Sequence, residues 1–170
     1  MIVRSFPPLA RSDATLLILG SMPGKASLMA NRYYAHPRNL FWPIITETFG
    51  ADPGMPYEKR TGLLIMQRIA LWDVLQECYR ESALDSDIAA DSIVVNDFRR
   101  FFATHPRIGK ILFNGAKAEQ LFRRHVLPLL PGITQLAMIR LPSTSPANAG
   151  IAIETRKRKW RDALTGITPD

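Results

Sequence analysis

Cysteine is almost absent from this sequence: among 170 residues there is a single one, Cys78. One thiol excludes a disulfide framework within the chain. It also excludes cysteine-ligated iron–sulfur clusters and cysteine-rich zinc sites, because both need several thiolates. A chain without disulfides is typical of reducing compartments, so we expect a cytoplasmic protein.

Histidine is rare as well. His36, His105 and His125 show none of the spacings that are typical of metal ligands. The paired histidine–glutamate and proline–cysteine motifs of zinc-dependent nucleobase deaminases are missing, which excludes deamination by that route. The sequence therefore predicts no metal centre.

Long apolar runs are also missing, whereas positive charge is abundant. No segment approaches the roughly 20 apolar residues of a membrane span, and residues 1–13 lack the apolar stretch of a signal peptide. We therefore expect no membrane association. The 22 Lys and Arg residues against 15 Asp and Glu residues give a net charge of +7. This excess favours a polyanionic partner such as nucleic acid, and a basic protein without nucleic-acid function stays an alternative.

Strand-like and helix-like apolar patterns alternate along the chain. Short apolar runs predict buried strands at residues 15–19, 69–72, 110–113 and 133–141. Amphipathic spacing and end signals predict helices at 40–49, 57–67, 98–104, 116–126 and 154–164. Residues 1–14 read as a proline-containing lead-in, and residues 73–80 are ambiguous. We expect a single domain over residues 1–170, an α/β fold with a three-layer α/β/α sandwich around a four-stranded parallel sheet.

Three of the predicted strands end in polar loops that contain glycine or proline, at Gly20, Asn114 and Leu141. The carboxyl ends of parallel strands meet at one edge of a sheet, and ligands of open α/β sheets bind outside that edge. The three loops are therefore predicted to form one site.

The loop after Gly20 has an unusual composition. Two tyrosines, a histidine, an arginine, an asparagine, a phenylalanine and a tryptophan fall within residues 33–42. Aromatic faces combined with neutral hydrogen-bonding groups suit a flat heteroaromatic ligand such as a nucleobase. Residues 20–26 look like a phosphate-binding Walker A loop, but the glycines are one residue too close. Pro23 removes an N–H group and Ala26 stands where a hydroxyl is needed, so we do not expect a nucleotide triphosphatase.

Several side chains in these loops allow a structural and a functional interpretation. Asn39 precedes an apolar helical run and is either an N-cap or a site residue. Phe41 and Trp42 are adjacent, so a helix cannot bury both on one face; one of them is a candidate for the pocket wall, with core packing as the alternative. Asn114 is either a tight-turn residue or an amide that hydrogen-bonds to a base edge.

The second conspicuous loop, residues 141–149, combines two prolines with three hydroxyl side chains. It is either a surface turn or a phosphate clamp built from hydroxyl and free N–H groups. The basic residues between Arg156 and Arg161 allow two interpretations as well: a solvated helix face or a strip that contacts phosphates.

Taken together, these segments resemble the uracil-DNA glycosylase superfamily, and most closely its hypoxanthine-DNA glycosylase branch. The resemblance rests on GSMPG, YYAHPRNLFW, LWDVL, FNG and LPSTSPANA, which occur in this order between residues 20 and 149. It implies an α/β/α fold, no metal or organic cofactor, and a damaged base that is flipped out of DNA. Relatives that remove uracil or thymine usually carry an asparagine at the position of Met22. In the hypoxanthine branch the asparagine of the HPRN segment takes over, which implies a catalytic role for Asn39.

The resemblance also implies the remaining site residues and the reaction. Hydrolysis of an N-glycosidic bond builds negative charge on the leaving base, and preorganised donors can stabilise it without a carboxylate base. The expected activity is hydrolysis of deoxyinosine in DNA by a monomeric, monofunctional glycosylase that releases hypoxanthine. A uracil or mismatch glycosylase and a catalytically silent damaged-DNA-binding module are the alternatives. The expected base-binding residues are Gly20, Ser21, Met22, Tyr33, Phe41 and Asn114, and the expected phosphate and loop residues are His36, Arg38, Ser143, Thr144, Ser145 and Asn148.

Overall fold

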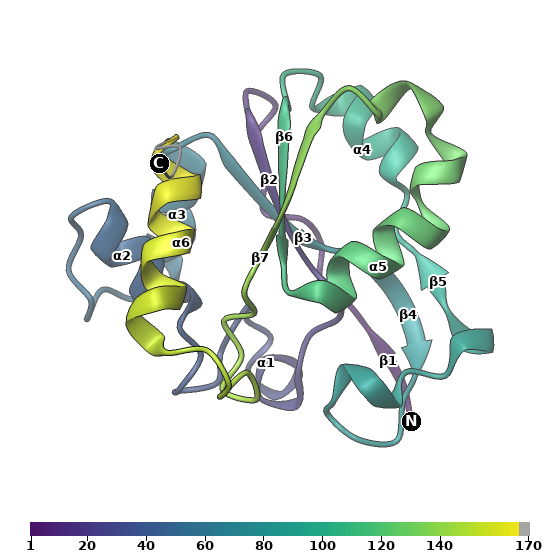
Figure 1. Ribbon diagram of the computed structural model, residues 1–170, viewed down its shortest axis with the longest axis horizontal. Helices are drawn as coiled ribbons and strands as arrows, with labels where there is room; N and C mark the ends of the chain where they lie inside the picture. Colours follow the sequence, from purple (N-terminus) through teal and green to yellow (C-terminus); the bar gives the residue numbers. More distant parts are fainter. Residues whose placement is uncertain (167–170) are drawn as a thin grey trace.

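The computed structural model describes residues 1–166 and contains the predicted parallel sheet (Figure 1). Its strands are β2 (Leu16–Gly20), β3 (Ile69–Asp73), β6 (Lys110–Asn114) and β7 (Ala137–Leu141), in the order β3-β2-β6-β7. All three neighbouring pairs are parallel. Every residue of β2 and of the edge strand β3 is buried, because the sheet is covered on both faces and Leu9 forms a bridge to Leu71 on the outer side of β3. The four-stranded parallel sheet is confirmed.

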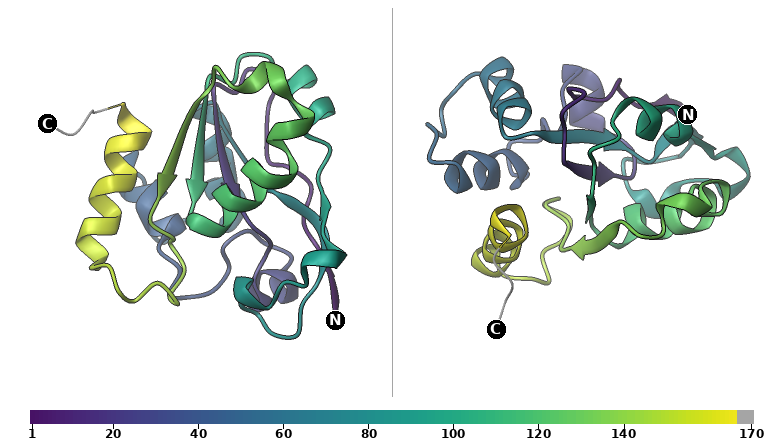
Figure 2. Two further views of the ribbon diagram at one scale, coloured as in Figure 1. Left: turned by 45° about the vertical axis from the view of Figure 1, so that its right-hand side comes forward. Right: turned by 90° about the horizontal axis from the view of Figure 1, so that it is seen from above.

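Helices cover both faces of this sheet, which confirms the three-layer α/β/α prediction (Figures 1 and 2). One layer contains α2 (Phe41–Thr48), α3 (Tyr57–Met66) and α6 (Ile153–Thr165); the other contains α4 (Phe98–Thr104) and α5 (Ala116–His125). The pleat of β2 sends Leu17 and Leu19 into one apolar core and Leu16 and Ile18 into the other. The sheet therefore separates two cores and is held rigid by both.

A second, antiparallel sheet was not predicted. It consists of β1 (Ile2–Arg4), β4 (Leu75–Tyr79) and β5 (Val94–Val95), in the order β1-β4-β5. β4 follows β3 after a single residue, so the ambiguous segment 73–80 is largely strand. The segment between β4 and β5 contains two short 3-10 turns, η1 (Asp85–Asp87) and η2 (Ala90–Ser92).

Other boundaries differ from the predictions. Residues 133–136 were predicted to be strand, but this was wrong: Ile133 ends the 3-10 turn η4 (Pro131–Ile133), which follows η3 (Leu127–Leu129), and residues 134–136 form a turn and a bend. Proline begins or interrupts such turns because it lacks a backbone N–H. A short helix, α1 (Lys25–Ala30), lies inside the loop that follows β2 and was not predicted. The Asp97 side chain caps α4 as expected by accepting a hydrogen bond from the Arg100 amide at 3.0 Å.

The strands of the parallel sheet end together at one edge. Gly20 pairs in register with Asp73, and Asn114 with Leu141. The predicted meeting of three strand ends is therefore confirmed, and a fourth, at Asp73, joins them. Within residues 1–166, no helix combines the length and apolar character needed to cross a bilayer.

Candidate active site

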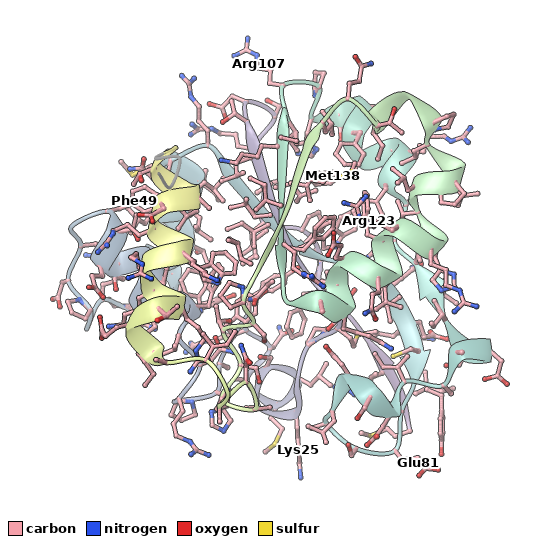
Figure 3. All side chains as sticks on the ribbon, viewed as in Figure 1. Lys25, Phe49, Glu81, Arg107, Arg123 and Met138 are labelled. Atoms are coloured by element: carbon pink, nitrogen blue, oxygen red, sulfur yellow. The ribbon has the colours of Figure 1, made fainter. Side chains whose placement is uncertain are left out.

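A cleft of about 990 Å³ opens at this carboxyl edge. In Figure 3 the edge faces the bottom of the view, where Lys25 extends from the protein, while Arg107 extends from the opposite edge. Segments from all four strand ends contribute to the wall. The lining comprises residues 20–27, Tyr33, Tyr34, His36, Asn39, Asp73, residues 83–85, 114–116 and 140–148, Ile151 and Lys159.

The turn after β2 is held in place by backbone hydrogen bonds to the next strand. The Val74 amide donates to the Gly20 carbonyl at 2.8 Å, and the Leu75 amide donates to the Ser21 carbonyl at 3.1 Å. Met22 is buried in an apolar core while also lining the cleft. A Cβ at Gly20 would overlap Oδ1 of Asp73 and lie 3.0 Å from Oη of Tyr34, so only glycine fits here.

Tyr33, expected to bind the base, uses its polar groups within the fold. Its hydroxyl donates to the Pro7 carbonyl at 2.9 Å, and its carbonyl accepts from Nε1 of Trp42 at 2.7 Å. The side chain lies edge-on to Phe6, with ring centroids 5.2 Å apart. Although Tyr33 touches the cleft, it is 4% exposed and belongs mainly to the core.

Phe41, expected to stack on the base, is completely buried and does not line the cleft. Its ring is stacked beneath Tyr34, with centroids 4.2 Å apart, and edge-on to Trp42 and Trp160. Of these two stacked rings, that of Tyr34 lines the cleft and that of Phe41 lies behind it.

Tyr34 is held in an unusual state. Its φ of 53° places it in the left-handed region, which is strained for a tyrosine. Its hydroxyl oxygen is buried without a hydrogen-bond partner in residues 1–166. Burial is the main reason that the pKa of this hydroxyl is raised well above its ordinary value. Tyr34 therefore stays neutral and presents an unused donor beside Gly20.

Asn39 is half-buried in the cleft wall at the start of α2. Its Oδ1 accepts a hydrogen bond from the Phe41 amide at 2.9 Å, which closes a turn just before the helix. The N-cap of α2 is Leu40, so the prediction of Asn39 as N-cap was wrong by one residue, although its oxygen still satisfies the first amide of the helix. Among the described residues, Nδ2 of Asn39 donates to no protein group. This part of the amide is thus free to act on a ligand.

Asn114 is fixed by Thr144. Its Oδ1 accepts from the Thr144 amide and its Nδ2 donates to Oγ1 of Thr144, both at 2.9 Å. Thr144 is fully buried, and its carbonyl oxygen also accepts a hydrogen bond from the Leu40 amide at 3.0 Å. One amide therefore connects the end of β6 to the 141–149 loop and, through it, to the start of α2. Thr144 uses one N–H and one oxygen lone pair of Asn114, which leaves one of each.

The other residues of the 141–149 loop line the cleft but hydrogen-bond among themselves. Oγ of Ser143 accepts from the Ser145 amide at 3.2 Å, and Nδ2 of Asn148 donates to the Ser143 carbonyl at 3.0 Å. Nη1 of Arg156 donates to the carbonyls of Ser143 and Ser145 at 3.3 and 3.1 Å. Arg156, expected either on a solvated face or in a phosphate-contacting strip, is therefore a buried support of this loop.

His36 and Arg38, both expected near phosphates, differ in position. His36 lines the cleft, and its Nδ1 accepts from the Arg38 amide at 3.1 Å. Arg38 is exposed and outside the cleft lining. Eleven of the thirteen predicted site residues line the cleft. Phe41, Arg38 and part of the basic strip lie outside it.

Two acidic residues of the cleft were missed. Asp73 is 3% exposed, and its Oδ2 has no hydrogen-bond partner among residues 1–166. Burial, followed by the nearby Asp85, raises the pKa of Asp73 to about 7, while Arg80 opposes the shift. Oδ2 of Asp85 accepts from Oγ of Ser21 at 2.5 Å. Burial raises the pKa of Asp85, an effect that the Ser21 hydrogen bond opposes.

A sequence signal for Asp73 exists, since it directly follows the buried run 69–72 and so stands at a fourth strand end. No comparable signal marks Asp85, which is 64 residues from Ser21. In the described part of the chain, no group of three His, Cys, Asp or Glu residues is arranged to hold a metal ion.

Comparison with known proteins shows the family to which the chain belongs. The profile of the Uracil DNA glycosylase superfamily matches residues 7–164. A Methanosarcina acetivorans protein named hypoxanthine DNA glycosylase is 36% identical, covering 94% of this chain and 96% of the relative. A Methanosarcina barkeri protein of the same name is 33% identical, covering 95% and 97%.

A solved structure agrees with these matches. The solution NMR structure of a candidate uracil DNA glycosylase from Methanosarcina acetivorans superimposes with a TM-score of 0.81. It is 34% identical in sequence and covers 98% of this chain and 99% of its own. With a family match over nearly the whole chain and the same fold, this protein belongs to the uracil DNA glycosylase superfamily.

Proposed function

We propose that this protein is a monofunctional DNA glycosylase that hydrolyses the N-glycosidic bond of deoxyinosine, releasing hypoxanthine and leaving an abasic site. The observation that carries the proposal is the match to two relatives named hypoxanthine DNA glycosylase over 94% and 95% of the chain. The cleft supports it, because it is large enough for a flipped purine and has an aromatic wall at Tyr34.

The chemistry assigns the central role to Asn39. Water attacks C1′ of the sugar, the C1′–N9 bond breaks, and its electron pair leaves with the base. Met22 has no polar group that could orient this water, whereas Asn39 can donate to it from its free Nδ2 and accept its O–H at the second lone pair of Oδ1. Its oxygen is fixed by the Phe41 amide, so the remaining end is held in one orientation without further ordering.

The leaving base needs stabilisation as negative charge develops on it. Ser21, Asn114 and the backbone of residues 20–22 line the cleft where a flipped base would enter. Donors that are already in position cost no reorganisation when the charge appears, and they act strongly in a cleft that excludes water. Deoxyinosine pairs weakly in duplex DNA, so less free energy is needed to flip it than a paired base.

The proposed partner is DNA that contains a deaminated base. Lys25 and Lys159 lie at the cleft rim as exposed cations that can contact phosphates flanking the flipped nucleotide. We also propose that the protein acts as a monomer in the cytoplasm. One chain supplies the whole cleft lining, and the buried, unpaired thiol of Cys78 suits a reducing compartment.

The experiment uses a duplex with one deoxyinosine and a matched duplex with one deoxyuridine. We expect release of hypoxanthine and strand breakage only after alkali treatment, with slower or no release from deoxyuridine. Preferential release of uracil would instead assign a uracil or mismatch glycosylase. Tight binding to deoxyinosine DNA without base release would assign a catalytically silent binding module.

A further inference from the structure

We propose that Asp73 determines specificity by binding the lactam edge of the flipped base, with its carboxyl group hydrogen-bonded to N1–H and O6 of hypoxanthine. This inference rests on the proposed function and adds a residue that the resemblance does not supply. Its basis is the combination of strand position, cleft exposure and an unused polar atom.

The position of Asp73 is rigid. It is the last residue of β3 and pairs in register with Gly20, while its carbonyl oxygen accepts from Nδ2 of Asn96 at 2.8 Å. From this strand end the side chain lines the cleft over Gly20, whose missing Cβ leaves the space that the carboxyl group occupies. A side chain placed on a strand is held more precisely than one on a loop.

Two polar groups at this point lack partners. Oδ2 of Asp73 and Oη of Tyr34 are both buried without a hydrogen bond in residues 1–166. Oδ1 of Asp73 and Oη of Tyr34 are the atoms that approach Gly20, and the Asn114 side chain lies near enough to Oη to oppose the rise in the pKa of Tyr34. Buried polar groups are nearly always satisfied in folded proteins, so two unsatisfied groups facing one cleft indicate a ligand that completes them. The strained backbone of Tyr34 marks the same spot.

The surroundings favour the neutral carboxyl group. No Lys, Arg or His nitrogen lies within 4.0 Å of Asp73 in the described residues. The charged groups that act on it are Asp85 of η1 and Arg80 after β4, and the tyrosines facing it are Tyr33 and Tyr34. Burial and Asp85 outweigh Arg80 and hold the pKa of Asp73 at about 7. Other titratable groups of the cleft wall are Lys25, His36, Arg140 and Lys159, and Lys117 of α5 acts on Asp85.

A neutral carboxyl group can form a hydrogen bond with each of the two polar groups of the lactam edge, N1–H and O6. Its carbonyl oxygen accepts from N1–H, and its O–H donates to O6. An ionised carboxylate has only acceptors, so one of its oxygens would repel O6. Charge that develops on the leaving base spreads onto O6, and the O–H donor therefore binds the transition state more tightly than the ground state.

The test compares single-turnover excision of deoxyinosine by the wild type, Asp73→Asn and Asp73→Ala between pH 5.5 and 9. Asparagine keeps one donor and one acceptor but does not titrate. We expect Asp73→Asn to retain excision at pH 6 and to lack the decline that the wild type shows above pH 7. Asp73→Ala should be slower by roughly 10- to 100-fold, the usual effect of a paired base-edge contact.

A second substrate separates base contact from a structural role. Deoxynebularine is a purine nucleoside without O6 and N1–H, so its excision should be nearly the same for the wild type and Asp73→Ala. An equal loss on both substrates would show that Asp73 only supports the fold.

Two outcomes distinguish the inference from the proposed function. If the wild type releases hypoxanthine while Asp73→Asn shows the same decline above pH 7, the lactam contact is wrong. If the wild type releases no hypoxanthine at any pH, the proposed function itself fails. Should Asp73→Ala not fold, the pH profile of Asp73→Asn alone decides.

Discussion

At the scale of single residues, Asn39 uses the two ends of its amide for different purposes. Oδ1 caps the first amide of α2, whereas Nδ2 has no partner among residues 1–166 and borders the cleft. Removing the whole side chain therefore has two consequences, one for stability and one for activity. A substitution that keeps the cap but not the amide separates them.

We expect Asn39→Ala to lower the excision rate by about two to three orders of magnitude, the usual loss for one transition-state donor. It should also lower the free energy of unfolding by about 1 kcal/mol, because the cap is lost. Asn39→Ser keeps a capping oxygen, so its melting temperature should match the wild type while its excision stays slow. If Asn39→Ser recovered both properties, Asn39 would be a cap and nothing more.

Asp73 makes the stability of the fold depend on pH in a defined direction. Its pKa lies near the ordinary 3.8 in the unfolded chain and at about 7 in the folded protein. Between these values the folded state holds a proton that the unfolded state releases, so this group's contribution to stability falls as pH rises from about 4 to 7. Above pH 7 the loss is complete.

We therefore expect Asp73→Asn, which cannot ionise, to be increasingly more stable than the wild type as pH rises. Counted from pH values below 4, the difference should be about 1–2 kcal/mol at pH 5 and reach roughly 4 kcal/mol by pH 8, from about three pK units at 1.36 kcal/mol each. Thermal melts of both proteins at pH 5, 6, 7 and 8 measure it. A difference that stays constant with pH would mean that Asp73 is ionised in the folded protein.

The aromatic residues show what sequence cannot specify at this scale. Phe41 and Trp42 are adjacent on α2, so one of them was expected at the cleft. Both are buried, because α2 is enclosed by the sheet, by Trp160 of α6 and by the 33–34 segment. Helical periodicity indicates which face of a helix packs against the core. It does not show that a second face is buried by a residue such as Trp160, more than 100 positions along the chain.

At the scale of elements, the hydrogen bonds between Asn114 and Thr144 join three parts of the site. They connect the end of β6 with the 141–149 loop, which α6 supports through Arg156 and through Nε1 of Trp160, donating to the Pro142 carbonyl at 2.8 Å. The loop is therefore attached at both ends to regular structure. A loop that must position a nucleotide needs this kind of support.

We expect Thr144→Val to lower the free energy of unfolding by about 1–3 kcal/mol, since Nδ2 of Asn114 loses its buried acceptor. In a protein of this size each kcal/mol shifts the melting temperature by about 2–4 °C. Base discrimination should also weaken, because Asn114 is no longer fixed. Thr155→Val on α6 is the matched control: that threonine side chain makes no hydrogen bond within residues 1–166, so its melt should hardly change.

An unchanged melt for Thr144→Val would mean that the loop is held by Arg156 and Trp160 alone. Unchanged base preference, together with a lowered melt, would limit Asn114 to a structural role.

The elements themselves were predictable to different degrees. Three strands of the parallel sheet, β2, β3 and β6, are short and apolar and end at glycine or at a polar turn. Because of this local pattern, they were predicted within one residue of their bounds. β1 and β5 are only three and two residues long, and β1 pairs with residues 77–79, far along the chain. Pairing over such separations leaves no local pattern. The error at residues 133–136 came from apolar residues that form turns because Pro131 precedes them.

At the scale of the whole molecule, the net charge of +7 matters less than where the cations lie. Lys25 and Lys159 are exposed at the cleft. Arg156 is buried beneath the 141–149 loop, and Lys157 pairs with Glu47 at 3.0 Å, so two of the five basic residues of the predicted strip on α6 are committed to the fold. Arg107 precedes β6 and extends from the opposite edge of the sheet (Figure 3), and the exposed Arg124 lies in the last turn of α5, outside the cleft lining.

This distribution predicts which cations control the salt dependence of DNA binding. Each phosphate contact contributes about 0.9 to the slope of log K against log salt concentration on duplex DNA. The double variant Lys25→Ala, Lys159→Ala should therefore reduce the slope by up to about 2. The double variant Arg107→Ala, Arg124→Ala removes the same net charge from positions outside the cleft lining and should leave the slope unchanged. Equal effects of both variants would mean that binding follows total charge and that DNA does not lie across the cleft.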